Sequence, residues 1–314
     1  MSKSKNQEAI FFSIIIPCYN SQKSIIGTLE SCLKQSFPEK FFEVIVVNDG
    51  STDASEQLLL SWIAKNKCEH FFYYYQRNAG PSRARNLGIQ LARGKFVAFL
   101  DADDHFHPDK LQLIYNFYKR YPQIGIYAHN AIDGAYILYA PFTSALLLSP
   151  QEMLPLLLER NILATSTMVI RKELLHPTTA FNEKYRHCED YELWFKLCKE
   201  HSLLILPHVL TYANSTSEGL SGNEIAMYKR AKALVFAHSD LVVDAKLRRR
   251  ILWRAVREHL KMVLGYRRRR HDWLKRDNVF YLIEYFWLTI VTKIFPLKRK
   301  REYQHLFYQG LQNR

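Results

Sequence analysis

Short apolar runs alternate with helix-spaced segments through the first 130 residues of the chain. Strands are predicted over the apolar runs Phe12–Ile16, Val44–Val47, Phe71–Tyr75, Lys95–Leu100 and Gly125–Ala128. Helices are predicted between them, over Ser24–Lys34, Ala54–Lys65, Ser82–Ala92 and Pro108–Tyr121. This alternation indicates an α/β fold, with a doubly wound, mostly parallel, Rossmann-like sheet covered on both faces. Such sheets bind ligands beyond the carboxyl ends of their strands.

The pattern is less regular from residue 131 to 187 and then returns. It predicts a strand at Thr165–Ile170, a helix at Asp190–His201 and a further apolar run at Leu203–Leu206. The polar, glycine-containing stretch Asn214–Asn223 predicts a mobile loop, and helical spacing follows it to the end of the chain. We therefore expect one domain over residues 1–222, in halves of about 11–130 and 131–222, and a helical extension over 223–314.

The formal net charge of +14 is confined to that extension. Residues 1–244 carry 25 basic and 25 acidic side chains, whereas residues 245–314 carry 19 basic and 5 acidic ones. Within residues 246–270, apolar residues recur at helical spacing among arginines, which indicates a basic amphipathic helix. Such asymmetry points to a polyanionic surface, either a membrane or a nucleic acid, or to a helical subdomain with a solvated basic face.

The cysteine pattern and the apolar segments of the sequence indicate the cellular compartment in which the protein resides. The chain has five cysteines, an odd number without a C-x-x-C pair, which argues against a disulfide framework or zinc site and fits a reducing cytoplasm. The first residues lack the features of a signal peptide. The nearest candidate for a membrane span, Val279–Thr292, is short and contains Glu284, so no spanning helix is expected.

Polar residues follow the first two predicted strands directly. Pro17-Cys18-Tyr19-Asn20 comes after the first strand and Asn48-Asp49-Gly50-Ser51-Thr52-Asp53 after the second. Tyr19 offers a flat face for a nucleobase, and Asp49 offers an acceptor for an N–H donor. The alternative is a common N-D-G turn, with Asp53 capping the next helix.

Two basic residues lie in the first turns of the helix that follows Gly80. The run Asn78-Ala79-Gly80-Pro81-Ser82-Arg83-Ala84-Arg85-Asn86 opens with glycine and then places Arg83 and Arg85 on the helix. A helix N-terminus and arginine side chains both favour a phosphate group. The alternative is an ordinary capped helix with solvated arginines.

Two groups of carboxylates complete the candidate chemistry. Asp101-Ala102-Asp103-Asp104 follows the strand Lys95–Leu100, and a divalent cation would relieve the repulsion among its three carboxylates. Glu189 and Asp190 open the helix that carries Trp194, and a carboxylate there can act as a general base on a hydroxyl. The alternatives are acidic capping before Pro108 and a favourable partner for the helix dipole.

Taken in order, these motifs resemble the family 2 glycosyltransferases of the GT-A fold. The matching segments are FSIIIPCYN, EVIVVNDGSTD, NAGPSRARNLG, GKFVAFLDADD, STMVIRKELL, FNEKYRHCEDYELWFKL and the Tyr212–Gly222 loop, and they cover roughly residues 11–222. The ordered set is more specific than any one motif. A dinucleotide oxidoreductase would need G-x-G-x-x-G after the first strand, where this chain has PCYNSQKS.

The resemblance implies a role for each motif. It implies that the donor, a UDP-sugar, is bound by Pro17, Tyr19, Asn20, Asp49, Gly50, Arg85, Asp101, Ala102 and Asp103. Asp49 would accept from the base, Arg85 would lie near the diphosphate, and Asp103 would ligate Mn²⁺ or Mg²⁺ directly, with Asp101 acting through water. Asp190 would deprotonate the acceptor hydroxyl, with Glu189 and Trp194 on the acceptor side or in the shell behind it.

The implied reaction is a single displacement with inversion at the anomeric carbon. Relatives often carry a histidine in the loop that closes over the donor, whereas this chain has Ser215, Thr216 and Ser217. The resemblance is to bacterial enzymes of surface-glycan assembly, and it implies transfer of a hexose or N-acetylhexosamine to a glycan acceptor. The competing hypothesis is a non-catalytic, membrane-docked partner with a retained GT-A fold.

The basic extension suggests where such an enzyme would act. Each basic residue near an anionic leaflet contributes about 1 kcal/mol of attraction. We therefore expect a cytoplasmic protein held peripherally on the inner face of the cell membrane, acting on a lipid-linked acceptor and binding no nucleic acid. An undecaprenyl-diphosphate oligosaccharide or a lipopolysaccharide or lipooligosaccharide core would suit that location.

Overall fold

A computed structural model describes residues 9–133, 136–137, 144–159, 161–176, 180–185, 187–214, 224–242 and 244–251. The chain divides into two compact units, Met1–Leu234 and Val235–Arg314. All strands of the sheet belong to the first unit. The predicted domain boundary between residues 222 and 223 falls outside the described residues and stays a prediction.

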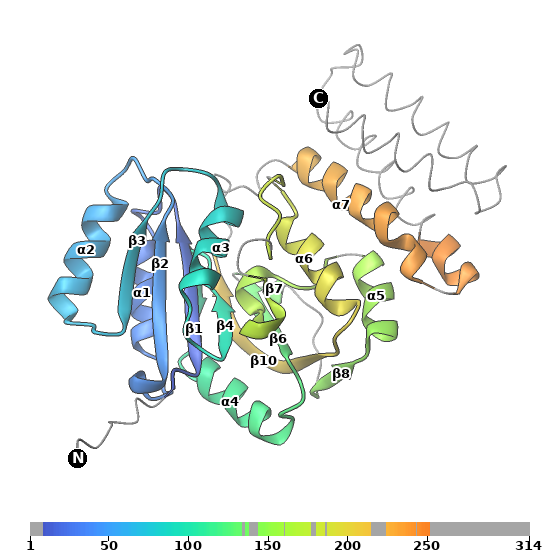
Figure 1. The fold of residues 1–314 in the computed structure, drawn as a ribbon, viewed down its shortest axis with the longest axis horizontal. Coiled ribbons are helices and arrows are strands. Elements are labelled where there is room, and N and C mark those ends of the chain that lie inside the picture. Colours follow the sequence, from blue (N-terminus) through green and yellow to red (C-terminus); the bar gives the residue numbers. More distant parts are fainter. Residues whose placement is uncertain are drawn as a thin grey trace, which may run out of the picture. The chain divides into compact units, whose positions relative to one another are not determined.

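The first half of the sheet consists of four parallel strands, as predicted. They are β1 (Phe12–Cys18), β2 (Phe42–Asn48), β3 (Phe71–Tyr75) and β4 (Phe96–Phe99), in the spatial order β3-β2-β1-β4 (Figure 1). The register places Cys18 opposite Asn48. The polar segments that follow β1 and β2 therefore start at the same edge of the sheet.

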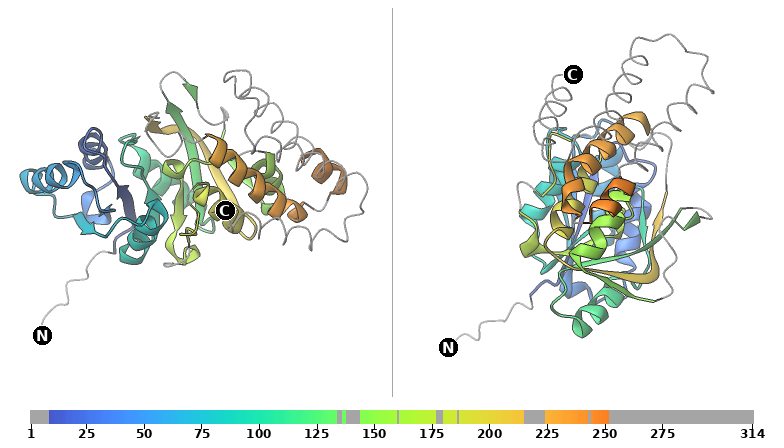
Figure 2. Two further views of the ribbon diagram at one scale, coloured as in Figure 1. Left: turned by 90° about the horizontal axis from the view of Figure 1, so that it is seen from above. Right: turned by 90° about the vertical axis from the view of Figure 1, so that its right-hand side faces the viewer.

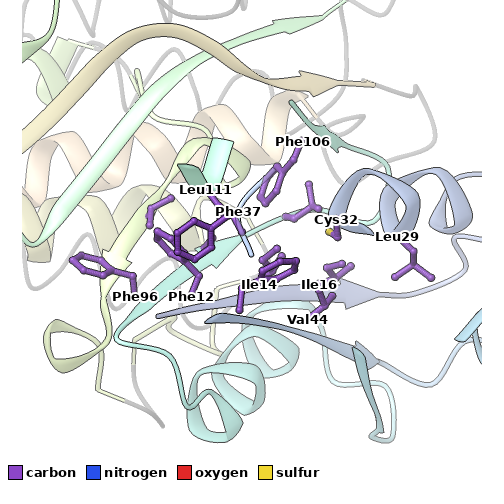
Figure 3. Close-up of a cluster of buried hydrophobic side chains, with 14 of the residues drawn as sticks. Phe12, Ile14, Ile16, Leu29, Cys32, Phe37, Val44, Phe96, Phe106 and Leu111 are labelled. Carbon is purple, nitrogen blue, oxygen red and sulfur yellow. The ribbon is translucent and has the colours of Figure 1, made fainter. Parts of the chain in front are cut away.

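Four helices cover this half, each within two residues of its predicted range. They are α1 (Ile25–Leu33), α2 (Ser55–Asn66), α3 (Pro81–Leu91) and α4 (Lys110–Arg120). Alternate residues of β1, Phe12, Ile14 and Ile16, enter a buried cluster with Leu29 of α1 and Leu111 of α4 (Figure 3). Ile15 points to the opposite face, against α3. Because successive residues of β1 point to opposite faces of the sheet and both faces are buried, the strand is a continuous apolar run in the sequence.

The second half of the sheet is mixed. β9 (Val169–Arg171) lies between β4 and β6 (Ile126–Asp133) and is antiparallel to both. β10 (Leu203–Ala213) is parallel to β6 (Figure 2), and β5 (His105–Phe106) and β8 (Leu146–Leu148) pair with β10 in antiparallel fashion. β7 (Tyr136–Ile137) pairs with β6. The predicted α/β fold is confirmed, and the parallel character of its sheet is strongest in β1–β4.

Three predicted details were wrong or incomplete in this half. Only the end of the predicted strand Thr165–Ile170 is extended, because Thr165–Thr167 forms a 3-10 turn. Both the N–H and the Oγ1 of Thr167 donate to the carbonyl of Ala164, which offers the backbone an alternative to a strand ladder. The apolar run Leu203–Leu206 is only the start of β10. Helix α5 (Pro150–Glu159) was not predicted, since Pro155 lies inside it.

Helix α6 (Glu189–Cys198) follows the prediction closely, beginning one residue earlier. Helix α7 (Glu224–His238) and a 3-10 turn at Ser239–Leu241 come next. The predicted mobile loop from residue 215 onwards and the basic segment after residue 251 lie outside the described residues. Among the helices that the structure describes, none is long and apolar enough to cross a bilayer.

The close packing of α3 on β1 yields a prediction for stability. A Cβ at Gly88 would lie 2.3 Å from Cγ2 of Ile15. We expect Gly88→Val to lower the free energy of unfolding by about 1–3 kcal/mol, because the helix must move away from the sheet. The matched control is Gln90→Ala on the exposed face of the same helix, which should change it by less than about 0.5 kcal/mol. Denaturant unfolding that finds Gly88→Val as stable as the parent would contradict this packing.

Candidate active site

The segments after β1 and β2 are hydrogen bonded to each other at the carboxyl edge of the sheet. The N–H of Asn20 donates to Ser51 Oγ at 3.1 Å, and the N–H of Thr52 donates to Asn20 Oδ1 at 2.8 Å. Asn20 has a φ of 49°, which lets its side chain and backbone face the same loop. Tyr19 is 49% exposed beside it, and Pro17 still lies within β1. Tyr19 therefore presents an open aromatic surface.

Asp49 is buried and organises the loop that precedes α3. It is 3% exposed. Its Oδ1 accepts from Gln76 Nε2 at 2.6 Å and from the N–H of Ala79 at 2.9 Å, and its Oδ2 accepts from the N–H of Gly80 at 2.8 Å. A carboxylate has about four acceptor sites, so one remains for a further donor such as a base N–H. The sequence did not reveal the three donors that hold it.

Gly50 and Gly80 both occupy backbone conformations that favour glycine. Gly50 has a φ of +69°, and a Cβ there would lie 2.7 Å from the backbone nitrogen of Asn78. Gly80 has a φ of +94° and precedes Pro81, the first residue of α3. Gly50 lets the loops after β2 and β3 approach each other closely, whereas Gly80 is required for its positive φ alone.

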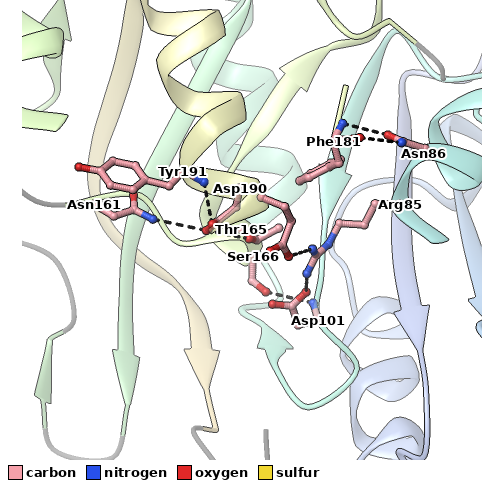
Figure 4. Close-up of polar contacts among 10 residues, drawn as sticks. Arg85, Asn86, Asp101, Asn161, Thr165, Ser166, Phe181, Asp190 and Tyr191 are labelled. Atoms are coloured by element: carbon pink, nitrogen blue, oxygen red, sulfur yellow. Dashed lines mark hydrogen bonds and ion pairs between the residues drawn. The ribbon is translucent and has the colours of Figure 1, made fainter. Parts of the chain in front are cut away.

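Arg85 forms a buried ion triad that links the two halves of the sheet domain (Figure 4). Its Nη2 donates to Asp101 Oδ1 at 2.7 Å, and its Nη1 donates to Glu189 Oε1 at 2.8 Å. Its guanidinium lies over the Phe181 ring, 5.3 Å from the centroid. Burial lowers the pKa of the guanidinium, but the charges and hydrogen bonds of Asp101 and Glu189 together outweigh it and raise the pKa, so Arg85 stays charged. The implied role near the diphosphate stays a prediction, and the observed partners of Arg85 are carboxylates.

The residues Asp101–Asp104 form a tight turn, here called the acidic turn. The N–H of Asp104 donates to the carbonyl of Asp101 at 3.0 Å, and the carbonyl of Ala102 accepts from Thr28 Oγ1 at 2.9 Å. Burial, followed by the charge of Asp101, raises the pKa of Asp103 and raises that of Asp104 to about 7. The turn therefore concentrates negative charge in a partly buried place.

This turn fits a divalent cation that shares its ligands with a phosphate group. The described residues hold no group of three or more histidine, cysteine or carboxylate side chains that could enclose a metal by themselves. Mg²⁺ is usually held by one or two carboxylates plus phosphate oxygens and water. In the described part of the chain no other side chain hydrogen bonds to Asp103, which fits a direct ligand, whereas Asp101 already binds Arg85.

Asp190 lies in the first turn of α6, on the other side of the Arg85 triad. Its Oδ1 accepts from the N–H of Tyr191 at 2.7 Å. Its Oδ2 accepts from Asn161 Nδ2 and Thr165 Oγ1, each at 3.4 Å (Figure 4). Burial, then the neighbouring Glu189, raises the pKa of Asp190 to about 6, although Arg85 opposes the shift. Asn161 and Thr165 were missed because no motif in the irregular 131–187 region marks them.

The two residues predicted beside Asp190 are both buried. Glu189 holds Arg85. Trp194 is 0% exposed, and its Nε1 donates to the carbonyl of Leu163 at 3.1 Å. Neither side chain presents a surface to solvent, so each can influence an acceptor only through neighbours such as Asp190.

Comparison with known proteins agrees with this geometry. Residues 13–176, more than half of the chain, match the family described as Glycosyl transferase family 2. An uncharacterized glycosyltransferase of Rickettsia felis is 33% identical over 198 residues, 61% of this chain but 31% of the relative. The amylovoran biosynthesis glycosyltransferase AmsB of Erwinia amylovora is 33% identical over 202 residues, 60% of this chain and 64% of AmsB. The chain thus spans less than two thirds of these relatives.

Solved structures share the fold. Residues 1–349 of TarS from S. aureus, in complex with UDP-GlcNAc, match with a TM-score of 0.62 at 24% identity, over 77% of this chain and 70% of that one. The mannosyltransferase PcManGT of Pyrobaculum calidifontis, in complex with GDP-Man and Mn²⁺, matches with a TM-score of 0.59 at 16% identity, over 95% and 84%. The predicted family is confirmed: the chain belongs to glycosyl transferase family 2.

Proposed function

We propose that this protein is an inverting glycosyltransferase that moves a hexose or an N-acetylhexosamine from a UDP-sugar to a glycan acceptor. The observation that carries the proposal is the Arg85 triad, because it joins the acidic turn to the residue beside Asp190. The proposal that Asp103 binds a cation and Asp190 acts as the base in the same site is supported by the triad, which links their neighbours Asp101 and Glu189.

The donor would bind over the loops that follow β1 and β2. Tyr19 offers an exposed ring for the base, and Asp49 keeps one acceptor site for its N–H. The fold likeness to a TarS fragment solved with UDP-GlcNAc supports a UDP-sugar. The sugar itself would lie between the acidic turn and Asp190.

Asp103 would hold Mn²⁺ or Mg²⁺ directly, and Asp101 would do so through water. The bound ion would supply charge stabilisation for the leaving diphosphate. Arg85 would keep Asp101 oriented, because its Nη2 donates to Asp101 Oδ1 at 2.7 Å. The structure of PcManGT with GDP-Man and Mn²⁺ supports a divalent ion in this fold.

Asp190 would accept the proton of the acceptor hydroxyl. Its Oδ1 accepts one short hydrogen bond from the N–H of Tyr191, whereas the two hydrogen bonds to its Oδ2 are long, at 3.4 Å each, so an acceptor hydroxyl could replace one of them at Oδ2. A pKa of about 6 leaves the carboxylate ionised at neutral pH yet basic enough to take a proton. The hydroxyl then displaces the nucleoside diphosphate in one step, with inversion and without a covalent enzyme intermediate.

The acceptor is proposed to be lipid-linked, and the protein to lie peripherally on the cytoplasmic face of the membrane. The support is the charge of the last 70 residues, which carry the whole net excess of +14. The biosynthetic role of AmsB supports a glycan acceptor. A flotation assay with anionic vesicles tests the membrane contact, and failure to float would leave the enzyme proposal standing without it.

Two substitutions test the metal and base assignments. Purified protein is incubated with a panel of UDP-sugars, membrane extract as acceptor source, and Mn²⁺, Mg²⁺ or chelator, and UDP release is measured. We expect Asp190→Asn to lower kcat about 10²–10⁴-fold while UDP binding persists, because the base is lost. Asp103→Asn should abolish metal-dependent UDP binding, since it removes the direct ligand.

The control for both variants is Asp109→Asn, which changes an exposed aspartate at the start of α4 and should keep parental activity. Parental turnover by Asp190→Asn would contradict the base assignment. Absence of turnover of every donor, together with no metal-dependent UDP binding by the parent, would favour the non-catalytic alternative.

The raised pKa of Asp190 predicts a pH dependence. A general base must be deprotonated, so kcat should rise with pH and level off above about pH 6. Glu189→Gln removes a negative neighbour that raises this pKa, so the rising limb should move to lower pH. Glu200→Gln, an exposed carboxylate just beyond α6, is the control and should leave the limb in place. If the rising part of the kcat–pH profile of Glu189→Gln lay at the same pH as in the parent, another group would be responsible for the titration.

A further inference from the structure

A fully buried lysine lies behind the acidic turn. Lys110, the first residue of α4, is 0% exposed. Its Nζ donates to the carbonyl of Ser166 at 2.8 Å and lies 3.3 Å from the centroid of the Phe106 ring. Lysine is almost never fully buried, because removing its amine from water is costly. Since no part of Lys110 reaches solvent, it cannot contact a ligand itself.

Ser166 is the neighbour that connects Lys110 to the acidic turn. Its carbonyl accepts from Lys110 Nζ and from Thr211 Oγ1, the latter at 2.9 Å, so both acceptor positions of that carbonyl are used. Its Oγ accepts from the backbone N–H of Asp101 at 3.0 Å. One residue in a 3-10 turn thus holds α4, β10 and the start of the acidic turn together.

The other end of the acidic turn is held from β10 as well. Asp104 Oδ1 accepts from the N–H of Asn214, just after β10, at 3.2 Å. Thr211, which contacts Ser166, lies on the same strand. The backbone N–H of Asp101 donates to Ser166 and that of Asp104 donates to the carbonyl of Asp101, so hydrogen bonds hold the backbone on both sides of Asp103, from which its side chain starts.

We propose that Lys110 is a positioning residue for the acidic turn, acting through Ser166 to fix the backbone that aims Asp103 at the cation and diphosphate. The part that concerns the cation rests on the proposed function. Groups behind a metal ligand orient it, and their loss usually lowers metal affinity or activity about 10–100-fold. Lys110 is such a group, because it hydrogen bonds to Ser166, which in turn accepts from the N–H of Asp101.

Lys110→Met tests this role with a matched control. Methionine keeps the length of the buried stem and removes the N–H donors. The control is Lys172→Met, because Lys172 also donates from Nζ to a backbone carbonyl, that of Ala92. Lys172 is distant from the acidic turn along β4. It follows Arg171, whose partner in the sheet is Phe96 at the start of β4, whereas Asp101 comes after the end of that strand. Full-length proteins are compared at a temperature where thermal unfolding shows all of them folded.

The first measurement needs no ligand. Hydrogen exchange followed by mass spectrometry should show faster exchange in peptides containing residues 101–104 for Lys110→Met, and parental exchange there for Lys172→Met. Parental exchange of this segment in folded Lys110→Met would overturn the proposal.

The second measurement is calorimetric titration with UDP in the presence of Mn²⁺. Lys110→Met should weaken binding about 10–100-fold, and Lys172→Met should leave it unchanged. Ser166→Ala should weaken binding too, and the double variant should lie within about 2-fold of the weaker single variant, because both changes act on one connection. If the fold-losses of UDP affinity of the two single variants multiplied in the double variant, the proposal that Lys110 acts through Ser166 would be overturned. A parent that bound no UDP would instead overturn the proposed function, and the exchange comparison would still decide the structural role.

Discussion

The burial of one positive charge between two negative ones determines how the site is built. Arg85 belongs to α3, which packs on β1, whereas Glu189 belongs to α6, and Asp101 follows β4. Removing the buried partner Glu189 would leave a guanidinium that is removed from water partly unpaired, and breaking a buried pair in this way costs about 3–5 kcal/mol. The triad therefore fixes the distance between the acidic turn and α6. The acidic turn and Asp190 both depend on it for their relative placement.

Hydrogen bonds within the protein already hold the loops around this triad. Asn20 connects the loops after β1 and β2, Asp49 holds the loop before α3, and Ser166 holds the acidic turn. These contacts join groups of the protein to one another, and loops that are held in this way lose less conformational entropy on binding. Tyr19 differs from these residues, because its side chain is exposed.

The sequence predicted the first half of the fold well, because β1–β4 and α1–α4 follow regular apolar spacing bounded by turn residues. Through family resemblance it also predicted that the acidic turn and Asp190 belong to one site, and that assignment stays a prediction. It could not show that Arg85 pairs with a residue 104 positions away, since spacing carries no information on such contacts. The turn at Thr165–Thr167 was read as a strand because threonine favours strands, whereas here its hydroxyl satisfies the backbone locally. Helix α5 was missed because of Pro155.

The position of β9 in the sheet also affects how the chain folds during its synthesis. β9 is inserted between β4 and β6, although it follows β6 by more than 35 residues in the sequence. Until residue 171 has left the ribosome, β4 is an open edge of a parallel sheet with unpaired backbone groups, and β6 has no neighbour through which to join it. Open edges of this kind pair with other chains. Nascent or truncated chains that end before Val169 are thus the species most exposed to aggregation, and chaperone protection matters most in that interval of synthesis.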